Sequence, residues 1–186
     1  MPVEVDGFVC SRRTSVDLSV EFDMVECARR KAAGVGALVD VGVLDGLMVL
    51  PAGLDVRADD LAPGVLSRLR PHGDGVVEFG FMNGMVRRVA VRPLRVREVR
   101  VHARSWAAGL PVLDPHAALA PRRLLLPSSP DRLDLLEAER FGVGVTADGV
   151  PVLEPRPFVQ RWTAAGWLLT ERVYGRLLVD GRVPDC

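Results

Sequence analysis

CSRRTSVDLSVEF, residues 10–22, decides how the start of this chain is expected to fold. Apolar and polar residues alternate along VDLSVEF, and they also alternate along VEVDGFVC just before it. Alternation with a period of two is typical of a β-strand that buries one face. The polar residues SRRTS between the two stretches suit a turn. The sequence therefore predicts a β-hairpin.

Three polar residues of the second predicted strand, Asp17, Ser19 and Glu21, occupy alternate positions. Alternate side chains of a strand point to the same side of the sheet. These three side chains therefore form either the solvent-exposed face of an ordinary hairpin or part of a ligand site. The residues alone leave both interpretations open.

Cap and turn residues predict two further elements in the first part of the chain. DMVECARRKAAG is expected to form a helix that ends at Gly34. Asn83-Gly84 lies between two β-rich runs in GVVEFGFMNGMVRRVAV, and this dipeptide favours a tight hairpin turn.

Helices are expected to follow. DPHAALAPRRLLL predicts a short helix that begins at Asp114, and SSPDRLDLLEAERFG predicts a helix capped by Ser129. VGVTADGVPVLEPRP is expected to be a loop or a small hairpin, and FVQRWTAAGWLLTERVYGRLL the last helix.

This order of elements predicts an α+β fold. A small mixed β-sheet formed by residues 1–110 is expected to precede packed helices in residues 111–186. The chain has 186 residues, close to the usual size of one domain, so the two parts can belong to one continuous domain.

Composition excludes several broad classes. Hydrophobic residues make up 48% of the chain and charged residues 26%, as in globular proteins. The net formal charge is zero, from 24 basic and 24 acidic residues, so no overall field attracts nucleic acid or membrane. The three cysteines are isolated, so no zinc ribbon or CxxC redox motif is encoded.

The sequence predicts a cytoplasmic protein that does not cross a membrane. MPVEVDGF lacks the basic and apolar regions of a secretory signal. The longest weakly polar run, residues 32–54, is interrupted by Asp40, Asp45 and five glycines, which a membrane-spanning segment would not contain.

CSRRTSVDLSVEF resembles the signature of compact bacterial, toxin-like members of the polymerase-β-like nucleotidyltransferases. In that family a strand leads to Gly-Ser, a short turn with Arg and Thr, and a strand that carries Asp-x-Asp. Ser11, Arg13, Thr14 and Asp17 match this pattern. The chain departs from it where Cys10 replaces the glycine and Ser19 replaces the second aspartate, while Glu21 lies one step further along the same strand face.

The resemblance implies a nucleotide site at the hairpin. Asp17 and Glu21 would be the catalytic carboxylates and would bind magnesium, while Ser11, Arg13 and Thr14 would bind the phosphates of a nucleoside triphosphate. Glu78 and Glu98 are candidates for a third carboxylate. The implied reaction transfers a nucleotidyl group to a hydroxyl acceptor, and the two departures leave open whether the protein is an enzyme or an inactive relative.

A second stretch, GLPVLDPHAALAPRRLLLPSSPDRLDLLEAERFGV, is similar to the part that follows the sheet in the same family. There a strand enters a helix that carries a basic residue. Arg122 or Arg123 would stand at that place and would steady the triphosphate.

The alternative function is a non-catalytic binding or assembly protein. An arginine-rich strand can contact nucleic-acid phosphates, although it can equally be a solvated sheet edge. Its residues are Arg87, Arg88, Arg92, Arg95, Arg97, Arg100 and Arg104. An apolar stripe along residues 158–178 predicts either a core helix or a helix shared with a second copy or a partner protein. The stripe contains Phe158, Trp162, Leu169, Val173 and Leu177.

Overall fold

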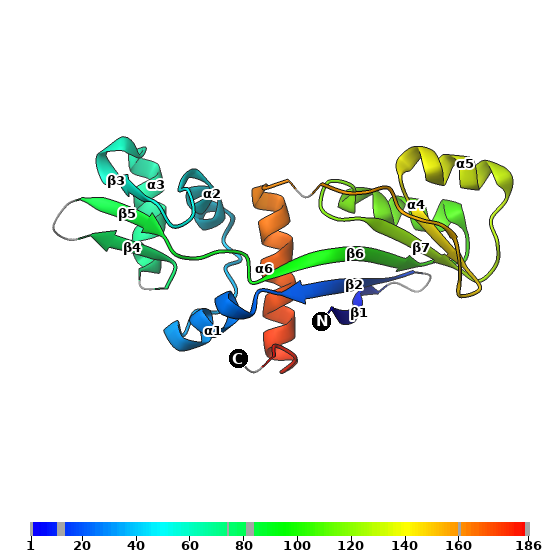
Figure 1. The fold of residues 1–186 in the computed structure, drawn as a ribbon, viewed down its shortest axis with the longest axis horizontal. Coiled ribbons are helices and arrows are strands. Elements are labelled where there is room, and N and C mark those ends of the chain that lie inside the picture. Colours follow the sequence, from blue (N-terminus) through cyan, green and yellow to red (C-terminus); the bar gives the residue numbers. More distant parts are fainter. Residues whose placement is uncertain (1, 11–13, 74, 81–83, 160, 185–186) are drawn as a thin grey trace. The chain divides into compact units, whose positions relative to one another are not determined.

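The computed structural model describes the chain except residues 1, 11–13, 74, 81–83, 160 and 185–186, and it leaves out the side chains of residues 9 and 10. The chain divides into two compact units (Figure 1). The first unit contains Met1–Glu21 and Val96–Arg161, and the second contains Phe22–Arg95 and Trp162–Cys186.

Most residues of a six-stranded sheet belong to the first unit. The strand order is β1-β2-β6-β7-β8-β9. The strands are β1 (Val3–Cys10), β2 (Ser15–Phe22), β6 (Leu94–His102), β7 (Arg122–Leu126), β8 (Gly144–Ala147) and β9 (Val150–Leu153). β6, β7 and β8 are parallel, whereas β1–β2 and β8–β9 are antiparallel pairs. The sheet is therefore mixed, and the α+β class is confirmed.

The N-terminal hairpin is confirmed. β1 pairs with β2 in a register that places Val5 opposite Leu18. Val16, Leu18 and Val20 are buried on one face of β2, as the alternation predicts. The register shifts between Val5 and Val9, and residues 11–13, which follow β1 in the sequence, lie outside the described part of the chain.

Two helices pack against the parallel strands, with α4 (Trp106–Leu113) contacting β7 and α5 (Arg132–Phe141) contacting β8. A short 3-10 turn, η3 (Asp114–His116), follows α4. Gly109 of α4 lies so close to β7 that a Cβ there would be 2.2 Å from Leu124 Cδ1. α4 thus covers Leu124.

The cap of α5 and the structure of residues 122–126 differ from expectation. Asp131, not Ser129, caps α5 by accepting the N–H of Asp134. Arg122–Leu126, expected to be helical, is the strand β7. Pro121 precedes it, and its residues alternate in burial between two parallel neighbours, so sheet pairing outweighs the helix propensity of a short Leu-rich run. VGVTADGVPVLEPRP does form a hairpin, β8–β9.

The second unit combines helices with a small antiparallel sheet of order β3-β5-β4. Its elements are α1 (Met24–Ala33), α2 (Val41–Val49), β3 (Asp55–Arg57), η1 (Ala58–Asp60), α3 (Pro63–Leu69), η2 (Arg70–His72), β4 (Val77–Gly80), β5 (Met85–Arg88) and α6 (Ala164–Val179). The hairpin expected at Asn83-Gly84 is the β4–β5 pair, although Asn83 itself is outside the described residues.

Burial of α6 accounts for much of the core of the second unit. Trp167 joins a cluster that includes Leu44, Leu47 and Leu69. Val173, Tyr174 and Leu177 of α6 are also buried. Within the described ranges, no helix has both the length and the apolar composition needed to cross a bilayer.

Candidate functional site

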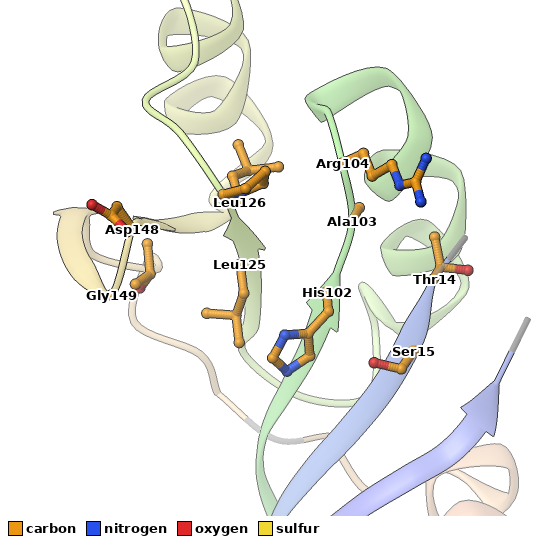
Figure 2. A pocket seen from close by; sticks show the side chains of 11 residues that line it. Thr14, Ser15, His102, Ala103, Arg104, Leu125, Leu126, Asp148 and Gly149 are labelled. Carbon is orange, nitrogen blue, oxygen red and sulfur yellow. The ribbon is translucent and has the colours of Figure 1, made fainter. Parts of the chain in front are cut away.

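The candidate functional site is a pocket of about 690 Å³ in the first unit, at the end where β6 and β7 finish. It is lined by Thr14, Ser15, His102, Ala103, Arg104, Leu125, Leu126, Pro127, Thr146, Asp148 and Gly149 (Figure 2). Ligands of open α/β sheets bind outside the carboxyl ends of parallel strands. A volume of this size suits a small organic ligand, whose sites commonly measure about 300–1,000 Å³.

A His102–Asp17 pair lies at the edge of this pocket. His102 Nε2 is 2.7 Å from Asp17 Oδ2, and Asp17 Oδ1 accepts the backbone N–H of Gly7 at 2.8 Å. Because an ionised carboxylate only accepts hydrogen bonds, a bond to ionised Asp17 requires the proton of this contact to be on Nε2 of His102. The His102 side chain is 52% exposed, whereas that of Asp17 is 16% exposed. The histidine, not the aspartate, is thus accessible to a ligand.

Arg104 supplies a positive charge at the pocket. Its side chain is exposed and makes no hydrogen bond or ion pair with the described part of the chain. α4 begins two residues later, with Ser105 as its cap, so the positive end of a helix dipole follows Arg104 directly. The hydroxyl groups of Thr14 and Ser15 add further polar groups to the lining.

The β8–β9 turn forms the opposite part of the lining (Figure 2). Asp148 and Gly149 both have positive φ, 48° and 74°. Asp-Gly is a preferred pair for the two-residue turn in which both residues adopt this conformation. The N–H of Asp148 also donates to Leu126 O at 3.0 Å, which holds the turn against the end of β7.

Thr14 is the one predicted phosphate-binding residue that the structure places at the pocket. Ser11 and Arg13 precede it directly in the sequence but lie outside the described residues.

Asp17 and Glu21 do not come together as magnesium ligands. They are four residues apart on β2, which corresponds to about 13 Å along a strand. Each is engaged separately, Asp17 with His102 and Glu21 with Arg97 Nη2 at 2.6 Å. The described residues contain no group of three or more His, Cys, Asp or Glu side chains arranged to hold a metal ion.

Neither candidate for a third carboxylate joins Asp17. Glu98 accepts hydrogen bonds from Arg100 at 2.7 Å and Arg123 at 2.9 Å. Glu78 belongs to β4 of the second unit, where it pairs with Arg87.

Arg122 and Arg123 lie at the start of β7, whereas the pocket lies at its end. Four residues of strand, about 13 Å, separate the two places. Arg122 donates to Phe141 O at 2.7 Å, while Arg123 pairs with Glu98 and with Glu154 at 2.6 Å. Burial lowers the pKa of Arg122, and the carboxylate of Asp114 opposes that change. The structure therefore does not bring either arginine to Thr14.

Three residues of the arginine-rich strand form ion pairs within their own units: Arg87 with Glu78, Arg97 with Glu21, and Arg100 with Glu4 and Glu98. Of the apolar stripe, Val173 and Leu177 of α6 are buried in the second unit, whereas Trp162 precedes α6 and is 56% exposed.

Sequence reasoning did not single out His102, and it named Arg104 only as one residue of the arginine-rich strand. The partner of His102 is remote, because Asp17 lies 85 residues earlier in the chain. The available signal was their position directly at the end of the strand LRVREVRVHAR, where open α/β sheets place ligand-binding residues.

No family model, curated protein or solved structure matches this chain. Function is therefore inferred from the geometry of the site.

Proposed function

We propose that the pocket of the first unit binds the phosphate groups of a nucleotide. In this proposal the protein is a degenerate nucleotidyltransferase-like protein that retains nucleotide binding. The observation that carries the proposal is the convergence of Arg104, His102, Thr14 and Ser15 on one pocket at the carboxyl end of parallel strands.

The chemistry of the lining suits a phosphate. A guanidinium group without a carboxylate partner forms short charge-assisted hydrogen bonds with phosphate oxygens, and its planar fork fits two of them. Hydroxyl groups of Thr14 and Ser15 add donors. The beginning of α4 favours negative charge nearby. The apolar side chains of Leu125 and Leu126 leave room for the less polar part of a nucleotide.

Nucleotidyl transfer requires a site for two metal ions in addition to a nucleotide-binding pocket. Two-metal catalysis holds its ions about 3.5–4 Å apart through shared carboxylates. To bind shared metal ions, the carboxylates of Asp17 and Glu21 would have to break their contacts with His102 and Arg97. Their positions on β2 would still be four residues apart. We therefore expect nucleotide binding to persist without magnesium and transferase activity to be weak or lacking.

The experiment is a thermal-shift series with each nucleoside triphosphate, in the presence and absence of magnesium. The proteins are wild type, Arg104→Gln, Asp17→Ala and the control Arg140→Gln, which removes an exposed arginine from the last turn of α5. A ligand at a hundredfold excess over its dissociation constant stabilises the native state by about 2.7 kcal/mol.

The proposal predicts a rise in melting temperature for wild type and Arg140→Gln, with or without magnesium, and its loss in Arg104→Gln. No rise with any triphosphate, or an equal rise in Arg104→Gln, would refute it. A rise that requires magnesium and vanishes in Asp17→Ala would instead place a metal at Asp17 and contradict the incomplete metal site.

A further inference from the structure

A second cluster of positive charge lies in the second unit. The guanidinium carbon of Arg92 is 4.4 Å from the ring centroid of Trp162, and that of Arg88 is 5.6 Å from Trp162 and 5.4 Å from Trp167. The two indole rings meet edge to face at 6.0 Å. Two arginines are thus held against two tryptophans.

Neither arginine has a carboxylate partner in the described part of the chain. Arg88 donates through Nη1 to Leu47 O at 2.9 Å, and Arg92 donates through Nη2 to Thr163 O at 3.2 Å. The Nε atoms of both are buried without a hydrogen-bond partner. Arg88 is only 7% exposed, so its charge is desolvated as well as unpaired.

This arrangement is electrostatically costly. Burial lowers the pKa of Arg88, and burial together with the charge of Arg88 lowers the pKa of Arg92. α6 begins directly after Thr163, so the positive end of its dipole lies beside Arg92. Tryptophan faces offset part of the cost through cation–π attraction. Arg30, in the same unit, is by contrast neutralised by two glutamates.

Trp162 differs from the other tryptophans in its exposure. Its residue surface is 56% exposed, whereas Trp167 is 0% and Trp106 is 4% exposed. An exposed indole beside unpaired arginines provides two things that nucleotides bind: a ring on which a base can stack and cations for its phosphate.

We propose that Arg88, Arg92 and Trp162 form a binding site for a phosphate-bearing nucleotide unit, either free or within a single strand of nucleic acid. The phosphate lies against the guanidinium group of Arg92, buried Arg88 adds positive charge nearby, and the base stacks on the exposed part of Trp162. This site is formed by residues of the second unit, and it does not depend on nucleotide binding in the pocket of the first unit.

The test measures binding of a labelled short oligothymidylate by fluorescence anisotropy, together with quenching of tryptophan emission. Unlabelled oligothymidylate, thymidine monophosphate and inorganic phosphate serve as competitors. The variants are Arg92→Gln, Trp162→Ala and the control Arg95→Gln, which removes an exposed arginine three residues away. Arg104→Gln is measured in parallel, because it acts only on the pocket of the first unit.

We expect Arg92→Gln and Trp162→Ala each to weaken binding about tenfold or more, since a hydrogen bond to a charged group or a stacked base commonly contributes that much. Arg95→Gln and Arg104→Gln should bind as wild type does. Competition by the monophosphate as effective as that by the oligonucleotide would identify a free nucleotide as the ligand. Much stronger competition by the oligonucleotide would identify single-stranded nucleic acid.

The proposal would be overturned by no binding to wild type by any of the three probes, by equal losses in Arg92→Gln and Arg95→Gln, or by unchanged affinity in Trp162→Ala. Because Trp162 is largely exposed, its replacement tests the site even if Arg92→Gln fails to fold. Loss of binding in Arg104→Gln alone would move the oligonucleotide to the first unit and also overturn it.

Discussion

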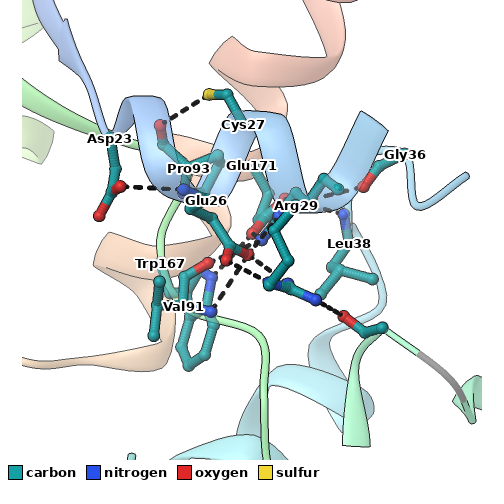
Figure 3. A network of polar contacts seen from close by, with 12 residues as sticks. Asp23, Glu26, Cys27, Arg29, Gly36, Leu38, Val91, Pro93, Trp167 and Glu171 are labelled. Atoms are coloured by element: carbon teal, nitrogen blue, oxygen red, sulfur yellow. Dashed lines mark hydrogen bonds and ion pairs between the residues drawn. The ribbon is translucent and has the colours of Figure 1, made fainter. Parts of the chain in front are cut away.

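Replacing Glu171 with alanine should destabilise the second unit more than the removal of any exposed ion pair would. Arg30 and Glu171 are both 0% exposed and form a two-pronged ion pair, with Nη1–Oε2 and Nη2–Oε1 distances of 2.7 Å. Glu171 also accepts the N–H of Leu38 at 2.9 Å and the indole N–H of Trp167 at 2.8 Å (Figure 3). One side chain thus joins α1, α6 and the segment before α2.

The magnitude follows from what the substitution leaves behind. Removing one partner of a buried pair leaves an uncompensated charge and costs about 3–5 kcal/mol. Glu26 remains bonded to Arg30 Nε at 2.7 Å, so we expect a value near the lower limit, about 3 kcal/mol. Burial lowers the pKa of Arg30, but Glu171 and Glu26 raise it by more, so the guanidinium group stays charged.

Urea unfolding followed by circular dichroism and tryptophan emission measures this loss. The control is Asp180→Ala, which removes the partially exposed partner of Arg176 at the end of the same helix and should cost at most about 1 kcal/mol. The double variant Arg30→Leu/Glu171→Leu leaves no unpaired charge, because Glu26 keeps Arg29 as its partner. It should therefore be more stable than the sum of the two single changes implies.

Equal stability losses for Glu171→Ala and Asp180→Ala would refute the role of this network. So would strict additivity of Arg30→Leu and Glu171→Leu, because it would mean that the two side chains are not energetically coupled.

Three further changes test the packing and the electrostatics of the first unit. Gly109→Ala should lower stability by about 1–3 kcal/mol in thermal melts, because the new Cβ would overlap Leu124. Burial and the charge of Arg122 lower the pKa of His116 below its ordinary value of 6.5. The unfolded chain therefore binds this proton more readily than the folded chain, and the free energy of unfolding decreases as the pH drops below 6.5. His116→Gln should flatten that part of the stability–pH curve. Asp131→Ala should cost about 1 kcal/mol in denaturant unfolding, because the first turn of α5 loses its cap.

Each of these three predictions has a result that would contradict it. Gly64→Ala should be tolerated, since nothing lies within 4 Å of its new Cβ, and an equal loss at both glycines would contradict the close approach of α4 to β7. A His116→Gln variant that keeps the acid limb of the wild-type stability curve would contradict the assignment to His116. An unchanged melting temperature in Asp131→Ala would show that the cap contributes nothing.

The local pattern of residues correctly predicted the two hairpins, whose strands are close together in the sequence. Alternation over VDLSVEF correctly indicated the first hairpin, and Asn83-Gly84 correctly indicated the second. RRLLL, which the sequence predicts to be helical, is a strand because it pairs with two parallel neighbours that are distant in sequence. Parallel pairing of this kind leaves little local signal.

The candidate site was predictable only in part, for the same reason. The position of Thr14 could be anticipated from the hairpin, but the partners of Asp17 and Glu21 could not. His102 and Arg97 reach them across the sheet from more than 70 residues away, and these contacts decide whether the carboxylates are available. The pairing of buried charges could not be predicted either, because Arg30 and Glu171 are separated by 141 positions in the sequence.

The central claim is that a nucleotide binds in the pocket of the first unit, and the imidazole resonances of the three histidines test it most directly. His102 lines the pocket, whereas His72 and His116 do not. In a nucleoside triphosphate titration followed by ¹⁵N imidazole NMR without magnesium, we expect the His102 signals to shift with saturation while those of the other two stay in place. Unchanged His102 signals at saturating nucleotide, whether or not another histidine responds, would contradict the claim.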